Sequence, residues 1–390
     1  MPRHPRFAPS VAGIEGSPYS ALAGRLASFA GETYPLHVGD TWMEPPEGAR
    51  MEDLRVTDHP GMHRYTSPHG MPALVAAVAE RVSRRSGLPT TGDEVLIAAG
   101  ATGGLGAILG ALLAPSDEVL ILAPYWPLIE GIVRSFHGKP VAVPFYGRDL
   151  LPADASPEDA VDLVRRHATG RTAVLYFNTP SNPSGRVLPR AQVEALVAWA
   201  AAEGLWIVSD EVYEDYVYTG EHTPARPLAP DRTFTAFSFS KAYGMAGNRV
   251  GYVVGPAAAM AEVRKVGVHS FYCAPTAGQL AALACLEGQG DAWVAAARDQ
   301  YRATGEAAAR RLGVEPPGGS TFLFLDVAEH LGEDGGGLGG FLERAVERGL
   351  FIAPGPSFGP FPTHVRLCFT AVPPEVTLRG VEVLAGLVGR

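Results

Sequence analysis

Lys241 is the residue whose position in the sequence most directly predicts chemistry. It closes the run Phe237-Ser-Phe-Ser-Lys241, and a glycine-containing turn then leads to Arg249. A lysine at the carboxyl end of a buried strand can point its amine into a cleft, and burial beside a cation favours the neutral amine that forms Schiff bases. Arg249 can supply that charge or clamp a phosphate, and Ser238 and Ser240 can add hydrogen bonds. A solvated lysine at a strand end explains the same spacing.

Lysine is rare in this chain, which narrows the search for a reactive amine. The sequence contains Lys139, Lys241 and Lys265 and no other lysine. None of them has a tyrosine four positions earlier, so the Tyr-x-x-x-Lys pair is absent. This argues against a nicotinamide-dependent reductase built on the glycine-rich turn at 102–106.

A carboxylate closes another strand signal. Residues 205–209 are apolar up to Ser209, and Asp210 follows, with Glu211 and Tyr213 close behind. In an enzyme that uses pyridoxal phosphate, an anionic partner keeps the pyridine nitrogen protonated, and the charged ring withdraws electrons from the substrate. Asp210 fits that role. Taken alone, it is explained equally by an N-cap at a strand-to-helix turn.

Two more segments are candidates for ligand contacts. Asn178-Thr-Pro-Ser-Asn-Pro-Ser-Gly185 follows a strand signal, and its prolines and glycine can hold the Asn182 amide rigidly toward a ligand. The stretch at 99–106 is predicted as a glycine-rich turn before a helix at 107–113, where free N–H groups bind anions. An ordinary Asn-Pro turn also explains the first segment. The second segment is not a P-loop, and its glycine spacing resembles a dinucleotide-binding motif only loosely.

These residues are predicted to be positioned by a mostly parallel sheet. From about residue 93 to 255, short apolar runs alternate with helical patterns such as 190–203, which is typical of an α/β sheet with helices on both faces. About eleven residues join the last two strands, so we expect that pair to be antiparallel. The predicted strands span 94–98, 118–122, 141–143, 172–176, 205–208, 233–237 and 249–254.

The pattern changes beyond about residue 285, which predicts a separate α+β unit. The expected helices span 291–312 and 341–348, and short strands are expected near 321–325 and 364–369. The glycine-rich run at 332–340 is predicted to be a surface loop.

Composition limits the kinds of partner. The chain has 390 residues, 46% of them hydrophobic, and a net charge of -9, so neither nucleic acid nor an anionic membrane is an expected partner. No apolar stretch approaches the ~20 residues of a membrane span, and the N-terminus lacks a secretory pattern. Cys273, Cys285 and Cys368 have no metal-ligand spacing, so we expect no metal site, no disulfide and a cytoplasmic location.

The segments together resemble the class I/II aminotransferases, the aspartate-aminotransferase-like branch of the fold-type I pyridoxal-phosphate enzymes. The resemblance covers nearly the whole chain, and Ser184 stands where threonine is commoner. It implies a large domain at 46–284, with a seven-stranded, mostly parallel sheet between helices, and a smaller α+β domain from 1–45 and 285–390. The motifs in order are Leu-His-Val-Gly39-Asp, Arg-Tyr65-Thr-Ser-Pro-His-Gly, Gly-Ala-Thr102, Pro-Tyr-Trp126-Pro, Asn182-Pro-Ser-Gly, Asp210 with Tyr213, Ser-Phe-Ser-Lys241, Arg249 and Val-Arg366-Leu.

The resemblance also implies a role for each matching residue. Lys241 would form the Schiff base with pyridoxal 5'-phosphate, and Asp210 would pair with the pyridine nitrogen. Asn182 and Tyr213 would bind the ring hydroxyl oxygen, and Trp126 would stack on the ring. The phosphate would be held by Ala101, Thr102, Ser238 and Arg249, with Gly100 and Ser240 beside them and Tyr65 reaching in from the other subunit of a homodimer. Arg366 would clamp the substrate α-carboxylate, opposite a backbone contact from Gly39 and beside Asn182.

The implied reaction is a ping-pong transfer of an amino group from an L-amino acid to a 2-oxo acid, with Lys241 as general base. No second arginine for a distal carboxylate is identified, and Trp42, Tyr125, Phe271 and Tyr272 indicate an aromatic or apolar side-chain pocket. Alternatives on the same scaffold are a lyase, an aminocyclopropane-carboxylate-synthase-like enzyme and an oxidative deaminase. A non-catalytic regulator would require an appended DNA-binding segment, for which the N-terminal stretch has no room.

Overall fold

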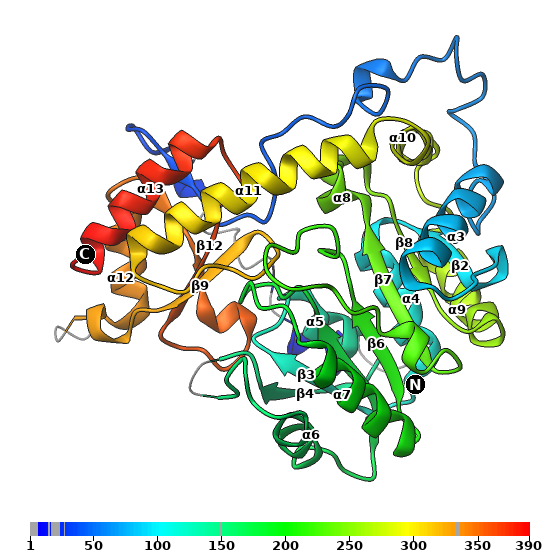
Figure 1. Cartoon of the computed structure of the whole chain (residues 1–390), viewed down its shortest axis with the longest axis horizontal. Helices are drawn as coiled ribbons and strands as arrows, with labels where there is room; N and C mark the ends of the chain where they lie inside the picture. The colour runs from blue at the N-terminus through cyan, green and yellow to red at the C-terminus, as the bar shows by residue number, and fades with distance from the viewer. Residues whose placement is uncertain (1–6, 15, 17–23, 27, 148–149, 333–335) are drawn as a thin grey trace, which may run out of the picture.

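A seven-stranded sheet forms the centre of the structure (Figure 1). The computed structural model describes residues 7–14, 16, 24–26, 28–147, 150–332 and 336–390. The strand order is β2-β8-β7-β6-β5-β3-β4, and every pairing is parallel except the two made by β8. The strands are β2 (Val95–Ala98), β3 (Glu118–Ala123), β4 (Lys139–Pro144), β5 (Thr172–Asn178), β6 (Trp206–Asp210), β7 (Thr233–Ser238) and β8 (Gly251–Val254).

All seven predicted strands are present, and the predicted antiparallel pairing of the last two is confirmed. The strand interiors are mostly apolar because both faces of a parallel sheet are buried. β8 begins at Gly251 rather than at Arg249 as predicted, because Arg249 has a left-handed backbone with φ 54° and cannot continue a strand.

Helices cover both faces of this sheet. On one face, α4, α5 and α9 share a buried core with β3, β5, β6 and β7. On the other, α6 and α7 pack over β3, β4 and β5, while α3 and α10 pack over β2 and β8. The bounds are α3 (Pro72–Ser86), α4 (Gly100–Leu112), α5 (Leu128–Ser135), α6 (Pro157–Arg165), α7 (Arg190–Ala202), α9 (Ala257–Ser270) and α10 (Thr276–Glu287).

The glycine-rich stretch before residue 107 is helical, so the prediction of a turn there was wrong. Helix α4 already begins at Gly100. Glycine weakens an isolated helix by about 1 kcal/mol per residue, but tertiary packing overrides that cost here. A Cβ on Gly104 would lie 2.4 Å from Cγ1 of Val253, so the missing side chain lets α4 lie directly on β8.

The C-terminal region forms a second body of structure beside the sheet. Helix α11 (Gly290–Leu312) runs from α10 to α13 (Pro374–Leu387) across the molecule (Figure 1). The small sheet of this second body has the order β11-β12-β9. The strands and the remaining longer helix are β9 (Phe322–Asp326), β11 (Ala353–Pro354), β12 (His364–Cys368) and α12 (Gly337–Val346).

The N-terminal segment joins this second body. Strand β1 (Tyr34–Pro35) pairs in parallel with β10 (Leu350–Phe351), and Leu36 is buried in the same core as α11 and α13. The division into domains at 46 and 285 remains a prediction.

The glycine-rich run at 332–340 is only partly a loop. Residues 333–335 lie outside the described part of the chain, and α12 starts at Gly337, because the helix buries Phe341 in the small core. In the described ranges, no helix has the length and apolar character needed to cross a membrane.

Candidate active site

A cavity of about 370 Å³ opens at the carboxyl ends of the central strands, between the large sheet and β12. Carboxyl ends of parallel strands are the usual place for ligands in α/β sheets. Every residue predicted for the site lines this cavity except Tyr65 and Gly100. Its walls are Gly39, Ala101, Thr102, Leu105, Trp126, Pro127, Leu128, Asn178, Asn182, Asp210, Val212, Tyr213, Ser238, Ser240, Lys241, Ala246, Arg249 and Arg366.

Lys241 contributes a lysine amine to the cavity. It lies on α8 (Phe239–Ala242), the single turn after β7, and its Nζ donates a short hydrogen bond to the carbonyl oxygen of Gly39. Burial lowers the pKa of Lys241; the Asp40 carboxylate opposes this shift, and the nearby cations Arg366 and Arg249 add to it. The other two lysines, both described, are exposed and pair with Glu118 and Glu262. Lys241 is therefore the lysine amine of this cavity.

Asp210 places a buried carboxylate in the same cavity. It is the last residue of β6, with an exposed fraction of 3%. Its Oδ2 accepts a hydrogen bond from the Tyr176 hydroxyl at 2.8 Å, and its Oδ1 accepts one from the Val212 N–H at 3.3 Å. Burial raises the pKa of Asp210 to about 6, although these two hydrogen bonds act to lower it. A cationic ligand group beside this carboxylate would relieve the cost of its burial.

Asn178 connects Asp210 to the loop that follows β5, and its role was not assigned from the sequence. Its Nδ2 donates to the Asp210 carbonyl at 2.8 Å, and its Oδ1 accepts from the Asn182 N–H at 2.6 Å. The sheet register places Asn178 directly opposite Asp210. Asn182 is thus held in the cavity wall, as predicted. The recognisable signal was an asparagine at the end of a strand, four residues before Asn182.

Arg366 forms the opposite wall from the small sheet. Its guanidinium lies between two rings, with Cζ 4.3 Å from the centroid of Phe322 and 4.7 Å from that of Phe358. Nη1 donates to Asn182 Oδ1 at 3.0 Å, and Nη2 donates to the His37 carbonyl at 2.6 Å. Burial, with the positive charge of Arg366, lowers the pKa of His37 to about 4, so that ring stays neutral. These contacts hold the guanidinium before a ligand arrives. Phe322, Phe358 and His37 were not predicted.

The amino end of α4 and Arg249 form an anion site at the end of the cavity. Gly100 has φ +70°, and a Cβ there would lie 2.6 Å from Nη2 of Arg249. Gly251 comes equally close, since a Cβ on it would lie 2.6 Å from the backbone nitrogen of Ala101. These glycines let a cation and backbone N–H groups converge with Ser238, which is the chemistry that binds phosphate.

Several predicted aromatic residues lie outside the cavity. The side chain of Tyr65 is 83% exposed, and its ring packs edge-on against that of Tyr272 at 5.0 Å. Trp42, Tyr125 and Phe271 do not line the cavity either. The aromatic or apolar pocket that was expected around these side chains is therefore not part of this cavity. Phe271 instead packs beside Gly103 of α4, and the Tyr125 hydroxyl donates to Glu130 at 2.8 Å.

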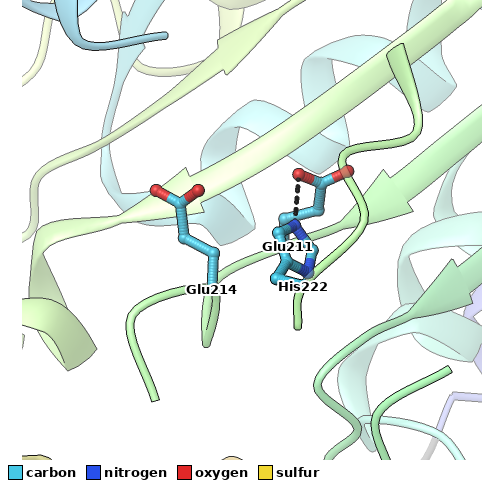
Figure 2. Close-up of side chains that lie close together, drawn as sticks. All are labelled: Glu211, Glu214 and His222. Carbon is cyan, nitrogen blue, oxygen red and sulfur yellow. Dashed lines mark hydrogen bonds and ion pairs between the residues drawn. The ribbon is translucent and has the colours of Figure 1, made fainter. Parts of the chain in front are cut away.

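A second group of titratable side chains follows β6 in the sequence (Figure 2). Donor atoms of Glu211, Glu214 and His222 all lie within 4.8 Å of one another, close enough to surround a cation. His222 Nε2 lies 2.9 Å from Glu211 Oε2, and Arg85 pairs with Glu214 at 2.9 Å. The other oxygen of Glu211 accepts from the Ala225 N–H at 3.1 Å. Because each group already has a protein partner, we interpret this cluster as an internal ion-pair network.

Comparison with known sequences agrees with this geometry. The family model described as aminotransferase class I and II matches residues 34–384. The aspartate/prephenate aminotransferase of Thermus thermophilus is 33% identical over 91% of this chain and 91% of its own length. An arginine–pyruvate transaminase of Pseudomonas aeruginosa is 35% identical over 79% of this chain and 78% of its own.

Solved structures show the same fold. A double mutant of the Thermus thermophilus aspartate aminotransferase superposes with a TM-score of 0.87 at 29% identity, covering 98% of this chain and all of the other. The N-succinyldiaminopimelate aminotransferase of Mycobacterium tuberculosis gives a TM-score of 0.88 at 25% identity, covering 98% of this chain and all of the other. The likeness therefore extends over both bodies of the structure.

Proposed function

Because this chain belongs to the class I and II aminotransferases and is a pyridoxal-phosphate-dependent aminotransferase, we propose that Lys241 would bind the cofactor through its amine and that Asp210 would pair with the cofactor's ring nitrogen. The observation behind this proposal is that one cavity contains a single lysine amine of lowered pKa and a buried carboxylate. An amine in the neutral form is the species that condenses with an aldehyde. A buried carboxylate is stabilised by a protonated ring nitrogen.

The residues present fit the cofactor. The bound cofactor supplies an aldehyde that condenses with amines and a ring that withdraws electrons from the substrate α-carbon. Arg249, Ser238, Ser240 and the amino end of α4 with Gly100, Ala101 and Thr102 would hold its phosphate. The ring oxygen would be bound by Tyr213 and by Asn182, whose Oδ1 is engaged by Arg366 so that its amide N–H remains to donate. Trp126 would stack on the ring.

Lys241 is the residue we assign to proton transfer. With the cofactor bound, the neutral Nζ would take the proton that the substrate α-carbon loses. Its lowered pKa keeps it unprotonated before this step. The hydrogen bond from Nζ to the Gly39 carbonyl supports this role, because the substrate is expected beside Gly39.

Arg366 recognises the α-carboxylate of the substrate in this proposal. A guanidinium fork matches a carboxylate with two parallel hydrogen bonds, and Phe322 and Phe358 already restrict it to one plane. Gly39 and Asn182 complete the carboxylate site. Because L-amino acids and 2-oxo acids share this carboxylate, one site can serve both halves of a ping-pong transfer.

The proposal extends to assembly and location. A homodimer would let the exposed Tyr65 of one subunit reach the phosphate of the other. A cytoplasmic location is supported by the three cysteines, all described and all free.

A screen of amino donors tests the reaction. Purified enzyme is mixed with single amino acids, and bleaching of the cofactor's visible absorbance is followed, with 2-oxo acid product measured with and without an acceptor. Transamination predicts one turnover without acceptor and continuous turnover with it. Full-rate product formation without an acceptor would contradict the proposal and favour a lyase or an oxidative deaminase.

The same screen defines the donor. Among the residues that line the cavity, Lys241, Arg249 and Arg366 are the cations, and each already has a proposed partner. Leu105, Leu128 and other wall residues are apolar. Aspartate, leucine and phenylalanine are therefore compared as amino donors. A preference for aspartate would show that a residue outside the cavity wall recognises the distal carboxylate of the substrate.

A further inference from the structure

We propose that Tyr176 is a positioning residue for this reaction, whose hydroxyl keeps the Asp210 carboxylate ionised and fixed toward the cofactor's ring nitrogen. The inference rests on the proposed function, since it takes Asp210 as the partner of that nitrogen. Tyr176 does not line the cavity, so it would act through Asp210 rather than on the ring.

The sheet register places the two side chains together. Tyr176 pairs with Val208 across β5 and β6, and Asn178 pairs with Asp210 two residues further along. Alternate residues of a strand share one face, so Tyr176 and Asp210 are diagonal neighbours, a separation that a long side chain can cross. The Tyr176 hydroxyl reaches Asp210 Oδ2 at 2.8 Å. The exposed fractions of the two residues are 0% and 3%.

The hydrogen bond from Tyr176 to Asp210 stabilises the ionised carboxylate, which packing of the tyrosine ring alone would not do. A buried carboxylate loses its hydration, so it tends to take up a proton unless donors face it. Among the described contacts of the Asp210 carboxylate, the Val212 N–H at 3.3 Å is the longer and the Tyr176 hydroxyl the shorter. Hydroxyl donors to carboxylates are among the strong hydrogen bonds of proteins.

The donor itself stays neutral. Burial raises the pKa of Tyr176 well above its usual value, and the nearby Asp210 charge raises it further, so the phenol retains its proton. The other titratable groups that act on the Asp210 carboxylate are Glu211, which disfavours its charge, and Lys241, which favours it. Tyr213 and Tyr146 are also close to this carboxylate. Tyr176 is therefore a neutral donor whose hydroxyl contacts the Asp210 carboxylate directly.

The two hydrogen bonds to the carboxylate oxygens of Asp210 also restrict rotation of this side chain. With Oδ1 facing the Val212 N–H and Oδ2 facing Tyr176, the carboxylate plane is set from both sides. The Asp210 carbonyl is fixed as well, by Asn178 Nδ2 at 2.8 Å and the Thr179 N–H at 3.1 Å. A carboxylate held in this way meets the ring nitrogen without reorganising.

Tyr176→Phe removes only the hydroxyl and retains the ring in the core. Pyridoxal phosphate is titrated into the apoprotein, and kcat, KM and unfolding curves are measured on the reconstituted enzyme. The matched control is Tyr146→Phe, which removes another buried hydroxyl, one that donates to the Asn178 carbonyl at 2.9 Å and not to Asp210. Both substitutions are repeated in an Asp210→Asn background, which forms a double-mutant cycle.

The expected result separates positioning from packing. Tyr176→Phe weakens cofactor binding and lowers kcat, each about tenfold, while KM for the amino donor stays unchanged because Arg366 is untouched. Loss of the donor raises the pKa of Asp210, so the acid limb of cofactor binding moves to higher pH. Tyr146→Phe leaves both the affinity and the acid limb in place. In the Asp210→Asn background, Tyr176→Phe adds nothing further.

Two results would overturn the inference. If Tyr176→Phe matches Tyr146→Phe in cofactor affinity and acid limb, or has the same effect with Asn at position 210, then the hydroxyl only packs. If Asp210→Asn alone leaves cofactor affinity and kcat unchanged, the assignment of Asp210 itself fails, and this inference fails with it. The single substitution at Asp210 therefore shows which of the two claims is wrong.

Discussion

At the scale of single residues, the site is built from charged groups whose positions are set before any ligand binds. Arg366 illustrates this, since two rings and two hydrogen-bond acceptors determine where its guanidinium lies. Asp210 is fixed in the same way by two donors on its carboxylate. Such preorganisation lowers the cost of binding a small, highly charged substrate.

Arg366→Lys tests the carboxylate clamp. An ammonium cannot form a planar fork between Phe322 and Phe358, so kcat/KM should fall about 10- to 100-fold, mainly through KM. Steady-state kinetics measure the change, and the cofactor's absorbance should stay normal. The control is Arg186→Lys, at a half-buried arginine that lies near the Phe145 ring and outside the cavity. An unchanged KM in Arg366→Lys would mean that the α-carboxylate binds elsewhere.

Sequence reasoning found the charged members of the site more readily than their supports. Lys241 and Asp210 each end a strand signal, and rare or charged residues at such points are recognisable without a structure. Tyr176 and Phe322, by contrast, belong to apolar runs whose residues all look like core. Their roles depend on which strands are neighbours, and strand order is a tertiary property that no local pattern contains.

At the scale of elements, the glycine-rich start of α4 was the clearest error. Local propensity favours a turn there, because glycine loses more conformational entropy in a helix than any other residue. The helix forms because its small residues let it approach β8 and deliver its amino end to the anion site. The predicted strands succeeded because each is a short, mostly apolar run between breakers, a pattern that the buried sheet itself requires.

Two glycines of α4 provide a matched test of this explanation. A Cβ on Gly104 would collide with Val253, whereas on Gly106 its nearest neighbour is a Phe136 ring carbon at 3.8 Å. We expect Gly104→Ala to destabilise by about 1 to 3 kcal/mol through overpacking, and Gly106→Ala to stabilise by up to about 1 kcal/mol. Urea unfolding curves measure both. Equal effects of the two substitutions would show that contact with β8 does not explain the glycines.

At the scale of the whole molecule, buried charges connect parts that are distant in sequence. Arg81 of α3 pairs with Asp215 at 3.1 Å and with Asp291 of α11 at 3.3 Å. His222 and Glu211 extend this network on the segment after β6 (Figure 2). Burial by itself would lower the pKa of His222, but the Glu211 and Glu214 carboxylates together outweigh burial and raise it. Glu214 acts in the same direction as Glu211, and Arg85 opposes them.

This network predicts a pH-dependent contribution to stability. A histidine whose pKa is higher in the folded state than in the unfolded state stabilises fully below about pH 6.5, and the contribution is lost as pH rises through the folded value. His222→Gln should therefore destabilise by about 1 to 2 kcal/mol at pH 6 and by much less at pH 9. Thermal unfolding across this range measures the difference, with His63→Gln, at an exposed histidine, as control. A deficit that is constant with pH would show that His222 is not charged in the fold.

The most direct test of the whole account is borohydride reduction of the cofactor-bound enzyme, followed by mass spectrometry of its peptides. Two of the chain's three lysines, Lys139 and Lys265, are exposed and in ion pairs, so reduced cofactor should be found on the peptide that contains Lys241. Lys241→Ala should carry no covalent cofactor after reduction, while Lys139→Ala should carry as much as the parent. Cofactor trapped covalently in Lys241→Ala would contradict the account.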